Sequence, residues 1–316
     1  MSWRPDPDAF LRDLEAKPAT LRSFAGAVAS DLWRDLLGGR RIVMIGMGSS
    51  RFAAMPVAAR LRAIGIPAVA EYASTTVPQA GGTGTLAIGV SAGGTTPETV
   101  GAIERHRAAG SLTVAVTNTA GGPLVEAAEH HLAMQAGHET GGVACRSFQH
   151  TIALLLAMAD GPRVPDAIRR AADATEDLLA RREDWLPAAT ALLGETGRQF
   201  VLAPDARSSS AAQGALMFRE GPRSQADASE TGDWLHVDVY LTKPLDYRTL
   251  LFAGTPFDVE VLRWIAERGG QAFVVGREVP GATRTLRYRH DEDELVALLT
   301  ETIVAELVAA ELWRLA

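Results

Sequence analysis

Short apolar segments, each followed by a glycine- and hydroxyl-rich loop and then by a helical pattern, constrain the fold of this chain most. Arg41–Ile45 and Leu86–Val90 are the clearest of them, since neither alternates polar and apolar residues. Strands without such alternation are buried on both faces, as in a parallel sheet covered by helices. Three more strand candidates complete the first set: Pro67–Ala70, Leu112–Val116 and His131–Met134.

The same succession restarts after a helical stretch that ends near Leu193. Its strand candidates are Gln199–Ala203, Leu250–Gly254, Gln271–Val275 and Thr285–Tyr288. A chain of 316 residues also exceeds the usual size of a single domain. The sequence therefore predicts an α/β protein of two doubly wound parallel-sheet domains with flanking helices.

The expected domain boundaries follow from these patterns. We expect residues 1–37 to form N-terminal helices with a break near Pro18, residues 38–193 the first domain, and residues 194–316 the second. The second domain includes a long C-terminal helix over Asp291–Leu315.

Composition excludes several classes of protein. A net charge of −7 argues against a nucleic-acid partner, which normally meets a basic face. The one cysteine, Cys145, allows no intrachain disulfide, which fits a reducing compartment. The N-terminus has no signal-peptide pattern, and the longest apolar stretch, Thr151–Ala159, is too short to cross a bilayer. We therefore expect a cytoplasmic protein with no membrane contact.

Two loops that follow strands suit the binding of an anion. They are Gly46–Ser50, which opens a helix, and Ser91–Thr99, which also lies between a strand and a helix. Glycines let the backbone approach a ligand, and free N–H groups at a helix start attract a phosphate. Two alternatives remain open: plain helix initiation by Thr96 and Pro97, and a dinucleotide site at Gly46-x-Gly48. Arg51 at the third glycine position disfavours the dinucleotide site, and with it an oxidoreductase.

Three motifs of the first half identify a family resemblance. Ile45–Ser50, Ser91–Thr99 and Gly137–Phe148 resemble the SIS (sugar isomerase) domain, above all the double-SIS isomerase half of glucosamine-6-phosphate synthase and its stand-alone relatives. In the second half, Gln213–Glu220 and Glu230–His236 resemble the segments that carry the family's catalytic glutamate and histidine.

The resemblance implies a site and a reaction. Glu220 would move a proton between C1 and C2 of an open-chain sugar phosphate, and His236 would assist ring opening from the neighbouring subunit of a homodimer. It implies no cofactor and no metal, and the histidines near Glu139 show no metal-ligand spacing. The substrate-binding set that it implies is Gly48, Ser49, Ser50, Ser91, Ala92, Gly93, Thr96 and Glu139.

Departures from the family pattern reduce the number of reactions that we expect this chain to catalyse. Gly93 stands where the family has a serine, and Met217 where it has a lysine beside the catalytic glutamate. The segment 309–316 has no lysine, and no glutaminase domain is expected. We therefore expect a phosphosugar isomerase or an aminosugar-phosphate deaminase or deglycase rather than an amidotransferase. The alternative is a sugar-phosphate sensor without turnover.

Plainer interpretations of the same residues remain open. Glu220 ends its helix before Gly221, where the helix dipole disfavours an acid, yet it could be a solvated helix-end residue. His236 lies in an apolar, strand-like run and could be a structural histidine oriented by Asp233 or Asp238. Cys145 is expected to be a buried, inert thiol, and Arg146 to pair with Glu139 or to approach the phosphate.

Overall fold

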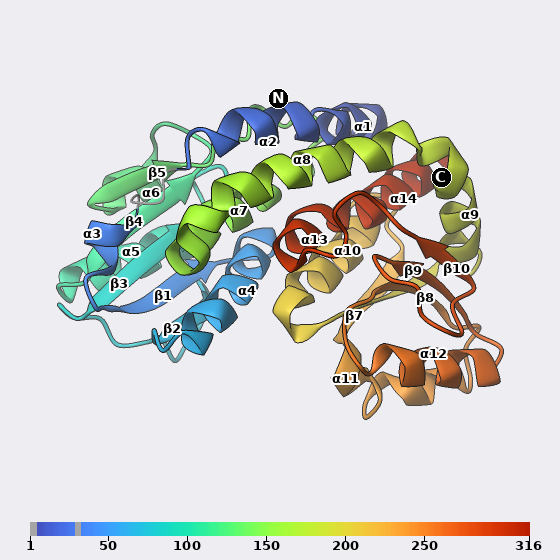
Figure 1. Cartoon of the computed structure of the whole chain (residues 1–316). Coiled ribbons are helices and arrows are strands. Elements are labelled where there is room, and N and C mark those ends of the chain that lie inside the picture. Colours follow the sequence, from blue (N-terminus) through green and yellow to red (C-terminus); the bar gives the residue numbers. More distant parts are fainter. Residues whose placement is uncertain (1–4, 29–32) are drawn as a thin grey trace. The chain divides into compact units, whose positions relative to one another are not determined.

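The computed structural model describes residues 5–28 and 33–316. Contacts divide the chain into two compact units, each discontinuous in sequence (Figure 1). The first unit comprises Thr20–His138 and Arg146–Ile168. The second unit comprises Met1–Ala19, Glu139–Cys145 and Arg169–Ala316. Each unit contains one of the two predicted sheets, and the expected domain ranges stay a prediction.

The sheet of the first unit is parallel throughout, as predicted, with the strand order β2-β1-β3-β4-β5. Its strands β1 and β3 are almost wholly buried because helices cover both faces. The strands are β1 (Arg41–Gly46), β2 (Ala68–Tyr72), β3 (Thr85–Val90), β4 (Leu112–Thr117) and β5 (His130–Ala133). The helices are α3 (Arg34–Leu37), α4 (Ser49–Ala63), α5 (Pro97–Ala108), α6 (Pro123–Ala127) and α7 (Arg146–Asp160), with the 3₁₀ turn η1 (Gly161–Arg163).

The sheet of the second unit is also parallel, with the order β10-β9-β8-β6-β7. Its strands are β6 (Arg198–Ala203), β7 (Gln225–Glu230), β8 (Arg248–Phe252), β9 (Gln271–Val275) and β10 (Arg284–Leu286). The helices are α1 (Pro7–Glu15), α9 (Arg182–Gly194), α10 (Ser208–Glu220), α11 (Thr231–Trp234), α12 (Asp258–Glu267), α13 (Glu294–Thr300) and α14 (Thr302–Leu315), with the 3₁₀ turns η2 (Asp205–Arg207) and η3 (Asp238–Thr242). The division between the units falls within α2 (Lys17–Ala25) and α8 (Val164–Ala180).

The predicted N-terminal break near Pro18 is confirmed: it lies at Ala16, and Pro18 is in the first turn of α2, where proline is tolerated. Two other elements differ from the prediction. The C-terminal helix is two helices, α13 and α14, which meet at Glu301. Strand β7 was not predicted, because of its residues only Ala226 is fully buried, so it shows no apolar pattern.

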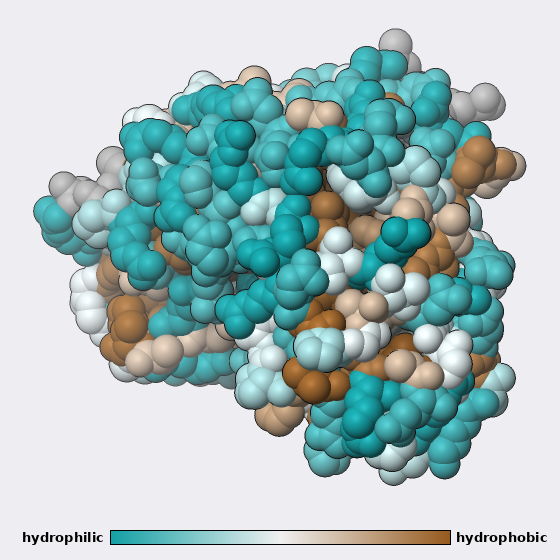
Figure 2. Space-filling view, turned by 45° about the vertical axis from the view of Figure 1, so that its right-hand side comes forward, coloured by the Kyte–Doolittle hydropathy of each residue, from teal (hydrophilic) through white to brown (hydrophobic). Residues whose placement is uncertain are grey.

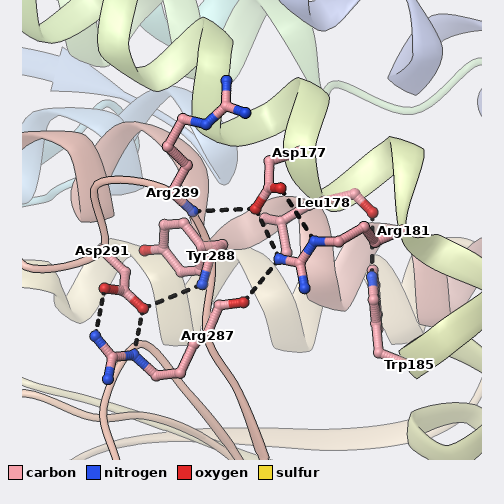
Figure 3. Close-up of polar contacts among 8 residues, drawn as sticks. All are labelled: Asp177, Leu178, Arg181, Trp185, Arg287, Tyr288, Arg289 and Asp291. Carbon is pink, nitrogen blue, oxygen red and sulfur yellow. Dashed lines mark hydrogen bonds and ion pairs between the residues drawn. The ribbon is translucent and has the colours of Figure 1, made fainter.

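Within the second unit, a network of hydrogen bonds joins α8 to the segment after β10 (Figure 3). Asp177 accepts hydrogen bonds from the Arg181 guanidinium and from the backbone N–H of Arg289, the latter at 3.0 Å. Beside it, Asp291 holds both the Arg287 guanidinium and the N–H of Tyr288. The loop that leads into α13 is therefore fixed on α8.

Candidate functional site

The loop Gly46–Ser50, here called the serine loop, joins β1 to α4. Gly48 has φ 50° and ψ −128°, a combination that favours glycine. A Cβ at Gly46 would lie only 3.0 Å from the backbone nitrogen of Arg51, so a side chain there would crowd the start of the helix. These two glycines explain why the chain turns so sharply from strand to helix.

The N-terminus of α4 is open. The helix has 15 residues, and no side chain caps its first turn. Its first two residues are Ser49 and Ser50, both half-buried, so their hydroxyls lie beside N–H groups at the positive end of the helix. This arrangement suits an anion.

The loop Ser91–Thr96, here called the threonine loop, joins β3 to α5. Thr96 stands at the N-cap position and Pro97 at the first helical position, as plain helix initiation predicts. However, the Thr96 hydroxyl makes no capping bond and lies 3.0 Å from the hydroxyl of Ser91, which is 5% exposed. The carbonyl groups of Ala92 and Gly93 accept hydrogen bonds from Asn118 and Thr119 after β4, which fixes this loop.

The two loops leave neighbouring strands at the same edge of the sheet. β1 lies between β2 and β3, so the chain passes to one side of β1 first and to the other side next. Ligands of such sheets bind beyond the carboxyl ends of the strands at this point of reversal. The structure thus brings the predicted serine and threonine residues of the first unit to one edge.

Arg51 is a further candidate residue of this site. In the sequence it was noted only because it occupies the third glycine position of a dinucleotide-binding motif. Its guanidinium carbon lies 3.7 Å from the ring centroid of Tyr72, which ends β2. Its Nε atom is buried without a hydrogen-bond partner among the described residues. Its position directly after Ser50 was the feature that could have identified it as a cation of the serine loop.

Glu139 begins the segment Glu139–Cys145, here called the 139–145 loop, which belongs to the second unit. Its Oε1 atom accepts the N–H of Cys145 at 2.8 Å, so the side chain bridges its own loop. Cys145 is fully buried, and burial raises the pKa of its thiol, which fits the predicted inert cysteine. Arg146, in the first unit, donates to the carbonyl of His138.

Glu220 is the last residue of α10, as predicted. It is half-buried, and burial raises the pKa of its carboxyl, although Arg223 and Arg219 act in the opposite direction. Among the described residues, no group forms a hydrogen bond or an ion pair with its carboxylate. A carboxylate with a raised pKa and no partner is suited to accept a proton from a substrate.

His236 does not lie in a strand, contrary to the sequence interpretation. It follows α11 in an exposed turn, in which its backbone N–H donates to the carbonyl of Asp233 at 2.9 Å. Asp238 accepts the hydroxyl of Ser229 instead of orienting the imidazole. Val237 beside it is 57% exposed, so this turn projects its side chains into solvent.

The corresponding edge of the second sheet is filled by carboxylates of the chain itself. Asp258 is 2% exposed and accepts the N–H groups of Gly254 and Thr255, which follow β8, at 2.7 and 3.0 Å. At the start of α10, Glu301 pairs with Arg207, and burial raises the pKa of Glu301 to about 7. The cavity of about 420 Å³ at this edge also contains acidic side chains, namely Asp205, Glu230, Asp291, Glu292 and Glu294. Arg207 and Arg277 also line this cavity, but the acidic side chains outnumber them, which disfavours a phosphate there.

No helix within residues 5–28 and 33–316 is long and apolar enough to span a membrane. In the same residues, no three histidine, cysteine or acidic side chains are grouped as metal ligands. On the face shown in Figure 2, hydrophilic residues predominate and hydrophobic ones form scattered groups.

Comparison with known proteins matches the segment that forms the first sheet to a protein family. Residues 35–160 match the SIS domain family. A glutamine–fructose-6-phosphate aminotransferase (isomerizing) from Aeropyrum pernix is 30% identical over 251 residues, which are 72% of this chain and 38% of that protein. The chain spans about two fifths of the length of the curated relatives it matches.

Solved structures show that the likeness in fold extends over both units. The C-terminal domain of glucosamine-fructose-6-phosphate aminotransferase from Francisella tularensis has a TM-score of 0.83 at 15% identity, covering 97% of this chain and 96% of that one. Tagatose-6-phosphate ketose/aldose isomerase from Escherichia coli has a TM-score of 0.80 at 16% identity, covering 99% and 95%. At these identities the likeness shows the SIS fold of both sheets.

Proposed function

We propose that this chain, a protein of the SIS domain family, binds a hexose 6-phosphate derivative and acts on it as an isomerase or as an aminosugar-phosphate deaminase or deglycase. The observation that carries the proposal is the Ser91–Thr96 hydroxyl pair at the end of β3, beside the strand that leads to the uncapped start of α4. The names of the similar proteins share a sugar 6-phosphate, which supports this ligand class.

The phosphate is proposed to bind at the serine and threonine loops. Hydroxyl groups and backbone N–H groups donate to its oxygens, and the positive end of α4 favours its charge. Gly93 offers no hydroxyl, so its contribution is limited to the backbone. The residues of this set are Gly48, Ser49, Ser50, Ser91, Ala92, Gly93 and Thr96.

Glu220 is the proposed base. It takes the proton from the carbon beside the carbonyl of the open-chain sugar and returns it to the former carbonyl carbon, while a proton passes from the hydroxyl oxygen to the carbonyl oxygen, which exchanges aldose and ketose. Burial of its carboxyl supports this role, because a raised pKa brings the base closer to neutral pH. Met217, one turn earlier, is buried and provides no ammonium group for a negatively charged intermediate. That absence favours isomerisation or C–N bond cleavage over amination.

Glu139 and His236 complete the proposed site. Glu139 contacts the sugar, and His236 assists ring opening. Because His236 projects from an exposed turn, we propose that it acts in the site of a second copy, which requires a homodimer. A cytoplasmic location, no cofactor and no nucleic-acid partner stay predictions.

A substrate panel tests the proposal. The chain is incubated with fructose 6-phosphate, glucosamine 6-phosphate and fructosamine 6-phosphates, and products are followed by NMR. Turnover that is lost in Glu220→Gln while the sugar phosphate still binds supports the enzyme. Binding without turnover of any compound would point to a sensor, and no binding of any phosphorylated hexose would refute the proposal.

A further inference from the structure

The carboxylate of Asp13, in α1, lies against the 139–145 loop within the second unit. It is 4% exposed, and its Oδ2 atom accepts the N–H groups of Thr140 and Gly141, both at 2.7 Å. Hydrogen bonds to an ionised carboxylate are shorter and stronger than bonds between neutral groups. The backbone that directly follows Glu139 is therefore fixed by α1.

The contact between α1 and this loop is a contact of backbones. A Cβ at Gly141 would lie 2.4 Å from the Cα atom of Phe10, so no residue with a side chain fits there. The carbonyl of Gly141 also accepts the N–H of Asp6, which caps α1, at 3.3 Å. The close approach keeps the Asp13 carboxylate within reach of two consecutive N–H groups.

The other end of the loop is held by α10. Gln213 is fully buried, and its Nε2 atom donates to the carbonyl of Ala144 at 2.9 Å. Gln213 and Glu220 are seven residues apart, so they lie on the same face of this helix. The loop that begins with Glu139 is thus fastened to the helix that ends with Glu220.

We propose that Asp13 is a positioning residue: by fixing the 139–145 loop, it sets where the Glu139 carboxylate lies relative to Glu220. The inference rests on the proposed function, because it takes both glutamates to act on one sugar. Displacing a sugar-binding group by about 1 Å can lower a rate by about a hundredfold. Asp13 therefore influences the reaction without touching the substrate.

The test compares two matched variants. Asp13→Asn keeps the size of the side chain and removes its charge. Asp258→Asn is the control, because Asp258 is equally buried in the same unit and its Oδ2 atom also accepts two consecutive N–H groups. We expect similar losses of thermal stability in both variants. We expect kcat/KM on the sugar phosphate to fall by about tenfold or more in Asp13→Asn alone, mainly through kcat.

Two further measurements separate positioning from general destabilisation. In a Glu139→Gln background, Asp13→Asn should add less than about a twofold loss, since the group it positions is already altered. Hydrogen–deuterium exchange at residues 140 and 141 should be faster in Asp13→Asn and unchanged in Asp258→Asn. If Asp13→Asn does not fold, Asp13→Ser, which is smaller and also removes the charge, replaces it in each measurement.

The outcomes distinguish this inference from the proposed function. If the unaltered chain turns over no sugar phosphate, the proposed function fails. If it does turn over substrate but both variants lose activity equally, only the positioning role is refuted. Unchanged exchange at residues 140 and 141 in Asp13→Asn would also refute that role, since the carboxylate would then not hold the loop.

Discussion

The hydroxyl groups of Ser91 and Thr96 lie 3.0 Å apart at the end of β3, although Thr96 occupies a position from which its side chain would ordinarily cap α5. The pair is formed by residues five apart in sequence, on either side of a glycine turn. Two neighbouring hydroxyls can both donate to one anion. The first prediction follows from this pair.

Ser91→Ala should weaken binding of the sugar phosphate by about tenfold to a hundredfold, since a hydrogen bond to a charged group contributes about 1.5–3 kcal/mol. Isothermal titration measures the affinity. Ser111→Ala is the matched control, because Ser111 is equally buried and bonded but precedes β4, at the opposite edge of the same sheet. Equal losses in the two variants would contradict a phosphate site at the threonine loop.

Glu220→Gln should lower kcat by about 10²–10⁴-fold and leave the affinity for the sugar phosphate nearly unchanged, because the amide cannot accept the proton. Rapid-quench or NMR assays measure the rate. Glu267→Gln, at the end of α12 in the same unit, is the control for loss of a helix-end carboxylate. A kcat that survives in Glu220→Gln would remove this residue from the reaction.

The pH dependence of the rate should follow the carboxyl of Glu220. Because burial raises its pKa, the base is ionised only above the usual range for glutamate, and kcat/KM should rise with pH through that raised value. Arg219 lowers this pKa, so Arg219→Gln should move the acidic limb of the profile to higher pH. The raised pKa of Glu220 also affects the stability of the fold. Its carboxyl binds a proton more readily in the folded state, which favours folding at low pH, and this contribution is lost as pH rises through the folded pKa.

Arg51→Gln should weaken sugar-phosphate binding by about tenfold and reduce its dependence on salt, because a cation of the serine loop would be removed. Titrations at two ionic strengths measure both effects. Arg62→Gln, in the last turn of α4, removes the same charge at the far end of that helix and should change neither. An affinity that stays unchanged in Arg51→Gln would show that the guanidinium serves only to stack on Tyr72.

Lys17 and Glu306 form an ion pair in which both side chains are fully buried. Lys17→Met should lower the free energy of unfolding by about 3–5 kcal/mol, since it leaves a buried carboxylate without its cation. The double variant Lys17→Met/Glu306→Leu should recover most of that loss, because it removes both charges. Urea unfolding measures these values, and a double variant no more stable than the single one would contradict this account.

The sequence predicted the elements that apolar patterns define. The strands β1, β3 and β4 and the loops after β1 and β3 were found because buried runs end abruptly in glycine and hydroxyl residues. Strand β7 was not predicted because it lies at the edge of its sheet and only Ala226 is fully buried. Its polar residues pair with β6 through the backbone, and backbone pairing leaves no pattern in the sequence.

The supports of the candidate site could not be predicted either. Asp13 is about 127 residues away from the N–H groups that it accepts, and no periodicity connects positions so distant. The turn that carries His236 was interpreted as strand-like because Trp234 to Tyr240 is mainly apolar. In the structure Trp234 ends α11 and donates to Tyr247, so its burial has a tertiary cause.

The positions of Asp258 and Glu301 at the second sheet bear on how many ligands one chain with two similar sheets can bind. A phosphate that approaches the second sheet meets Asp258 bonded to the N–H groups after β8 and Glu301 paired with Arg207, whereas β3 of the first sheet ends in the hydroxyl groups of Ser91 and Thr96. Under the proposed function, we therefore expect each chain to bind one sugar phosphate despite its two similar halves. A sigmoidal response to substrate would then have to arise between chains.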